Sequence, residues 1–121
     1  MRTTTIYHNP QCSTSRKVLA AIRDAGVEPH IIEYLKTPPT ADELKALACA
    51  TGEPLRRLIR TKQPEYLAQG LDNPQLSDDQ LAQALSATPV LIERPIVVSP
   101  LGTRLARPAE RVQDILPPAT G

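Results

Sequence analysis

One cysteine carries most of the chemistry that this sequence can support. Cys12 follows a short strand-like run and stands directly before the first helical pattern, in the segment from Tyr7 to Arg16. The first N–H groups of a helix have no partner inside it and form the positive end of its dipole. Both effects favour a thiolate over a thiol, and both attract anions. The segment therefore predicts a nucleophile and an oxyanion cradle in one place.

Two neighbours could tune this thiol. His8 lies across a short loop, and an imidazole near a thiol can stabilise the thiolate or move a proton. The alternative for His8 is a strand-end residue bonded to backbone. Ser15 could hydrogen-bond the thiolate from the first helical turn, or could be an ordinary helix N-terminal residue. Because Cys12-x-x-Ser15 lacks a second cysteine, a redox cycle needs another thiol, most simply an external one.

The other cysteine and histidine have less context. Cys49 stands late in a predicted helix, near its apolar stripe, and we expect a buried, inert thiol. A pairing of Cys49 with Cys12 stays open at this stage. We interpret His30 as structural or solvent-facing.

Three arginines border apolar runs instead of lying in a solvated row of charges: Arg60, Arg94 and Arg107. An oxyanion is best held by several planar, permanently charged donors, which makes arginine the suitable residue. Taken singly, each arginine is more often a surface residue. Pro95 follows Arg94, and because cis X–Pro bonds are a small minority, the local pattern predicts a trans bond.

Length and composition narrow the possible classes. The 121 residues, 40% of them hydrophobic, predict one compact domain over residues 1–121. With a net charge of +1 and no basic run, we expect neither nucleic acid nor a membrane as a partner. The N-terminus shows no signal-peptide pattern, which predicts a cytoplasmic location. We expect no bound metal or cofactor.

The order of elements predicts an α/β fold. A strand over residues 4–7, a helix over 13–25 and a strand over 30–34 form a parallel crossover unit. Capping boxes at residues 40–43 and 77–80 open two helices in a helical insertion. Strands at 96–98 and 103–105 and a last helix at 109–116 complete a ββα unit. The result is a mixed β-sheet flanked by helices.

Four segments carry a resemblance to a known family: residues 7–16, 34–40, 93–98 and 100–108. Together they resemble the glutaredoxin-coupled arsenate reductases, in the same order and over nearly the whole chain. The resemblance implies a thioredoxin-like fold with a helical insertion.

The resemblance also implies roles for residues. Cys12 matches the family's cysteine, whose thiolate attacks arsenate and forms a covalent arsenic–thiol adduct. His8 and Ser15 match positions that tune the reactivity of this thiolate. The three arginines, Arg60, Arg94 and Arg107, match those that hold the oxyanion and its reduced product. Pro95 matches the cis-proline of thioredoxin-like folds. Glutathione is then the co-substrate that attacks the adduct, glutaredoxin clears the mixed disulfide, and arsenite is released.

Two other functions are compatible with the same segments. One is a related glutathione-linked thiol oxidoreductase acting on another substrate. The other is a non-enzymatic redox regulator of the same fold, a class that typically switches through Cys-x-x-Cys. Ser15 at the second position of that motif disfavours the regulator.

Overall fold

Two compact units make up the molecule. The computed structural model describes residues 4–117. One unit combines the beginning of the chain, up to Tyr34, with its end, from Arg94 onward, and the other is the segment Leu35–Glu93. The helical insertion that the sequence predicts thus forms the second unit, and the β-strands belong to the first.

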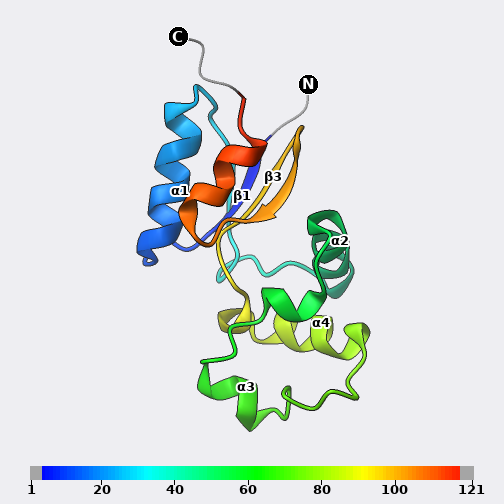
Figure 1. Cartoon of the computed structure of the whole chain (residues 1–121). Helices are drawn as coiled ribbons and strands as arrows, with labels where there is room; N and C mark the ends of the chain where they lie inside the picture. The colour runs from blue at the N-terminus through cyan, green and yellow to red at the C-terminus, as the bar shows by residue number, and fades with distance from the viewer. Residues whose placement is uncertain (1–3, 118–121) are drawn as a thin grey trace. The chain divides into compact units, whose positions relative to one another are not determined.

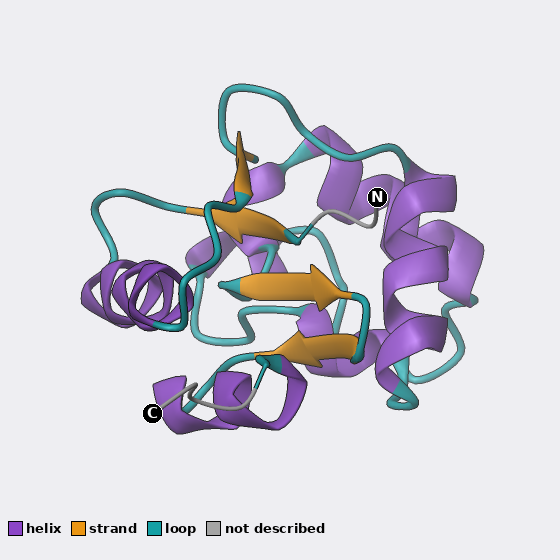
Figure 2. Ribbon diagram, turned by 90° about the horizontal axis from the view of Figure 1, so that it is seen from above, coloured by secondary structure: helices purple, strands orange, loops and turns teal. Residues whose placement is uncertain are grey.

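The first unit is built on a mixed four-stranded sheet (Figures 1 and 2). Its strands are β1 (Thr5–His8), β2 (His30–Glu33), β3 (Ile96–Ser99) and β4 (Gly102–Leu105). Their order across the sheet is β2-β1-β3-β4, with β1 and β2 parallel and the other two pairs antiparallel. This arrangement confirms the predicted α/β class and mixed sheet.

Two helices cover one face of this sheet, α1 (Ser13–Asp24) and η3 (Ala109–Ile115), side by side in Figure 1. The last helix is a 3₁₀ helix that ends one residue before the predicted Leu116. The chain leaves α1 through Gly26, whose φ of +85° suits a residue without Cβ. The core between helices and sheet consists of buried aliphatic side chains, among them Ile6, Val18, Ile22, Val97, Val112 and Ile115.

The second unit is helical. Both predicted capping boxes are present, at Thr40 for α2 (Ala41–Thr51) and at Ser77 for α4 (Asp78–Ala87). These two helices pack together, and Lys45 of α2 pairs with Asp79 of α4. Three short helical pieces complete the unit: η1 (Leu55–Leu58), α3 (Pro64–Ala68) and η2 (Pro89–Leu91). Within residues 4–117, no helix has the length and apolar character that crossing a membrane requires.

The prediction of a buried Cys49 is wrong, since the residue is exposed on α2. Leu44, Leu47 and Ala48 form the buried stripe of this helix. At 100° per residue, Cys49 lies about 160° around the helix from Leu47, which turns its side chain away from the packed face. Proximity in sequence to an apolar stripe was therefore a poor guide to burial.

Candidate active site

The sheet register brings Cys12 and the Arg94–Pro95 pair to one end of the first unit. Strand β1 runs antiparallel to β3, with Tyr7 opposite Ile96. The end of β1 therefore lies beside the start of β3. Cys12 follows β1 by a short turn, and Arg94 and Pro95 come directly before β3.

The hairpin of β3 and β4 adds a second arginine at the same end. The Ala106 N–H donates to the Pro95 carbonyl at 2.9 Å, which extends the antiparallel pairing beyond the strands. Arg107 is thereby carried back beside Arg94. Nη1 of Arg107 lies 3.5 Å from the Arg94 carbonyl oxygen and 3.9 Å from Sγ of Cys12. Two arginines that were weak candidates singly thus flank one thiol.

Two proline bonds near the thiol are cis. The Arg94–Pro95 bond is cis, as the family resemblance implied, and not trans as the local pattern predicted. The Arg107–Pro108 bond is also cis, which the sequence analysis did not predict. Both arginines at this site therefore directly precede a cis-proline.

Cys12 has the environment of a thiolate. It is the N-cap residue of α1 and is 8% exposed. Burial raises the pKa of the thiol. Hydrogen bonds from the Ser15 and Thr14 backbone and the charge and side chain of Arg94 lower it by more, so that the pKa lies below its ordinary value. The helix terminus and one arginine together outweigh the desolvation of the sulfur.

Ser15 connects Cys12 to His8. Its side chain is fully buried, and its Oγ lies 2.6 Å from Nδ1 of His8 and accepts the Asn9 N–H at 3.1 Å. The hydroxyl thus contacts the C-terminal end of β1, whereas the backbone N–H of Ser15 hydrogen-bonds the Cys12 thiol. His8 is therefore connected to the thiol through Ser15. The sequence analysis had considered a direct effect of the imidazole on the thiol.

The surroundings of His8 favour its neutral form. Burial lowers its pKa, the charges of Arg16 and Arg23 lower it further, and Glu33 on β2 opposes them. A neutral imidazole can share the hydrogen bond with Ser15 as donor or as acceptor, according to its tautomer.

This burial predicts a pH-dependent stability. Between the lowered pKa of His8 in the folded protein and about 6.5 in the unfolded chain, the unfolded state binds more protons. The free energy of unfolding therefore rises with pH across that window. Urea unfolding between pH 5 and 8 should show this slope, and His8→Gln should reduce it even if its overall stability is lower. An undiminished slope in His8→Gln would contradict the assignment.

Arg60 belongs to the second unit, between η1 and α3. Its Nε lies 3.7 Å from Oε1 of Glu93, and its Nη1 donates to the side-chain oxygen of Gln63 at 2.7 Å, with that amide oriented to accept. Its backbone N–H donates to the Leu91 carbonyl at 2.7 Å. These contacts hold the backbone and part of the guanidinium of Arg60 within its own unit. A role for Arg60 in oxyanion binding stays a prediction from sequence.

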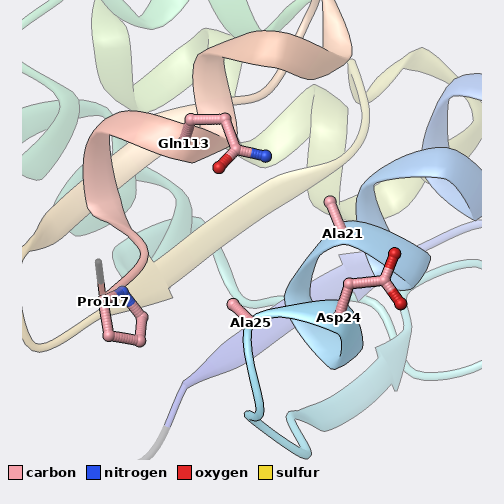
Figure 3. A pocket seen from close by; sticks show the side chains of 5 residues that line it. All are labelled: Ala21, Asp24, Ala25, Gln113 and Pro117. Atoms are coloured by element: carbon pink, nitrogen blue, oxygen red, sulfur yellow. The ribbon is translucent and has the colours of Figure 1, made fainter. Parts of the chain in front are cut away.

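A hollow lies at the C-terminal end of α1, away from Cys12 (Figure 3). It has a volume of about 210 Å³ and is lined by Ala21, Asp24, Ala25, Gln113 and Pro117. With 12 residues, α1 is about 18 Å long, so this hollow is remote from the N-terminal end that carries Cys12. The charged group on its lining is a carboxylate, which makes it unsuited to an oxyanion.

Asn9 and Arg16 contact the turn before Cys12, although the sequence analysis gave them no role. The Asn9 side chain accepts the Gln11 N–H at 3.0 Å, and the Arg16 side chain donates to the Pro10 carbonyl at 2.8 Å. The Asn-Pro pair was the available signal, since it favours turn initiation.

A mixed four-stranded sheet, a cysteine at the N-terminus of α1 and a cis-proline at the start of β3 define a protein of the thioredoxin-like class. A model of the ArsC family matches residues 7–115, and the chain belongs to this family.

Several arsenate reductases are similar to this chain in sequence over most of their length. The arsenate reductase of Rhizobium meliloti (strain 1021) is 54% identical over 115 residues, which are 95% of this chain and 82% of the relative. The arsenate reductase of Escherichia coli (strain K12) is 51% identical over 98% of this chain and 84% of its own. The solved structure of an arsenate reductase from Vibrio cholerae superposes with a TM-score of 0.91 at 44% identity, covering 95% of this chain and 98% of that one.

Proposed function

We propose that this protein reduces arsenate to arsenite, with the Cys12 thiolate as nucleophile and with glutathione and glutaredoxin as the reductants. One observation carries the proposal: the thiol at the N-terminus of α1 lies 3.9 Å from the guanidinium of Arg107. A reactive thiol beside a permanent cation suits an oxyanion substrate. The names of relatives that share half of their residues with this chain give the same substrate.

The chemistry balances with two external thiols. The Cys12 thiolate attacks arsenic(V) and displaces one oxygen, which leaves as water after protonation. Glutathione attacks the arsenic of the adduct, forms a second arsenic–sulfur bond and displaces a second oxygen as water. A thiolate of glutaredoxin then attacks the glutathione sulfur and forms a mixed disulfide, which breaks that arsenic–sulfur bond and leaves its electron pair on arsenic. These two thiols supply the two electrons that convert arsenic(V) to arsenic(III). Hydrolysis of the bond between Cys12 and arsenic(III) releases arsenite and regenerates the thiol.

The other residues of the site support these steps. Arg94 and Arg107 neutralise the oxyanion and the charge that develops as the arsenic–sulfur bond forms. Arg60 is the third arginine of this set by its match to the family pattern. Ser15 and His8 hold the thiol at the helix end, where its pKa is low. Pro95 shapes the backbone between Arg94 and β3.

The low pKa of Cys12 is directly measurable. Iodoacetamide reacts with the thiolate, so its rate constant against pH reports the pKa of the thiol. In a Cys49→Ser background, Cys12 is the remaining cysteine, and we expect the midpoint below the ordinary value of about 8.5. A midpoint at or above that value would contradict a thiolate-based site.

The function itself is tested by arsenite formation in a reconstituted reaction. Purified protein is supplied with arsenate, glutathione, glutaredoxin, glutathione reductase and NADPH, and arsenite is quantified directly. We expect turnover with the full mixture and a large loss when glutaredoxin or glutathione is omitted. Turnover with thioredoxin alone would overturn the choice of reductant. Absence of arsenite in every mixture, together with reduction of a glutathione mixed disulfide, would favour the thiol oxidoreductase instead.

A further inference from the structure

The turn that leads to Cys12 has its central peptide held at both ends. It runs from Asn9 to Cys12, and the Cys12 N–H donates to the Asn9 carbonyl at 3.0 Å. The central peptide joins Pro10 to Gln11. Its carbonyl accepts a hydrogen bond from Nη1 of Arg16 at 2.8 Å, and its N–H donates to Oδ1 of Asn9 at 3.0 Å.

These two hydrogen bonds act on a single degree of freedom. The common β-turn types differ by rotation of their central peptide. A peptide is a rigid plane, so its carbonyl and its N–H rotate together. Rotating the peptide between Pro10 and Gln11 would break both bonds at once. The orientation of the plane directly before Cys12 is therefore fixed by two side chains, one on each side of the turn.

The backbone of each of these two residues is itself held by a hydrogen bond. The Asn9 N–H donates to Oγ of the buried Ser15 at 3.1 Å. The Arg16 N–H donates to the Cys12 carbonyl at 3.0 Å, the first hydrogen bond of α1. The turn is thus held from the strand end by Asn9 and from the helix by Arg16.

We propose that Asn9 and Arg16 are positioning residues for Cys12, which together keep the Pro10–Gln11 peptide in one orientation and the thiol at the helix N-terminus. The inference rests on the proposed function only in taking Cys12 as the reacting thiol. Neither side chain is required to touch the substrate.

The test compares two single variants with their combination. In the Cys49→Ser background, we measure the iodoacetamide rate constant from pH 6 to 9 for Asn9→Ala, Arg16→Met and the double variant. Loss of one net hydrogen bond is expected to slow each single variant about three- to tenfold near pH 7, with a midpoint moved to higher pH. Since both side chains hold one peptide, the double variant should be slower than the slower single variant by less than about twofold.

Conservative and charge-matched variants complete the design. Asn9→Ser and Arg16→Lys keep an acceptor and a donor, and each should recover part of the lost rate. Lys17→Met removes a neighbouring exposed positive charge from α1 and should react like the parent. Rates of the single variants equal to the parent, or losses that add in full, would overturn the proposal. Because iodoacetamide needs no arsenate, this result stands or fails separately from the arsenate assay.

Discussion

Replacing Cys12 with serine is expected to abolish arsenate reduction, with a fall in kcat of about a thousandfold or more. A serine hydroxyl stays protonated at the N-terminus of α1, where the thiol has a pKa below its ordinary value. Without a thiolate, no arsenic–sulfur bond forms. Arsenite production at saturating glutathione and glutaredoxin measures the effect.

The chain offers a matched control for this substitution. Cys49→Ser removes the second thiol, which is exposed on α2 and turned away from the buried stripe of that helix. We expect its kcat to stay within about twofold of the parent, as for most surface substitutions. Full turnover in Cys12→Ser, or loss of turnover in Cys49→Ser alone, would reject Cys12 as the nucleophile.

The second large effect is expected for Arg107→Ala, which should lower kcat/KM for arsenate by about a hundredfold or more. The guanidinium lies against Sγ of Cys12 and the Arg94 carbonyl, where an oxyanion attacked by the thiolate would develop its charge. Arg107→Lys keeps the charge but loses the planar donor pair, so an intermediate value is expected.

Two comparisons separate oxyanion binding from general damage. Arg57→Ala removes an exposed arginine of η1 that pairs with Glu53, and its kcat/KM should be close to that of the parent. The rate of Cys12 alkylation should fall far less in Arg107→Ala than arsenate turnover does. Equal losses in both reactions would mean that Arg107 acts on the thiol and not on the oxyanion.

Local signals in the sequence predicted most elements of the fold. The capping boxes at Thr40 and Ser77 each satisfy free helix N–H groups within four residues, so neighbouring chain is enough to define them. The alternation of strands with α1 likewise predicted the parallel pair and the mixed sheet. The exposure of Cys49 was missed because a helix face is decided by which partner packs on it.

The candidate site likewise has one part that local sequence predicts and one part that depends on long-range contacts. The placement of Cys12 at the start of a helix is a property of adjacent residues, and the sequence predicted it without a structure. Its contact with Arg107 spans 95 positions and depends on the register of three strands. Residue type and context made Arg107 a weak candidate, and the family resemblance connected it to Cys12.

By itself, then, the sequence determined the position of the thiol at a helix terminus, because helix starts and turns are set by hydrogen bonds between near neighbours. Only the tertiary structure decided which groups surround the thiol. The antiparallel pairing of β1 with β3 and of β3 with β4 brings Arg94 and Arg107 to the end of β1. Such contacts depend on how the chain packs, and residue spacing does not reveal them.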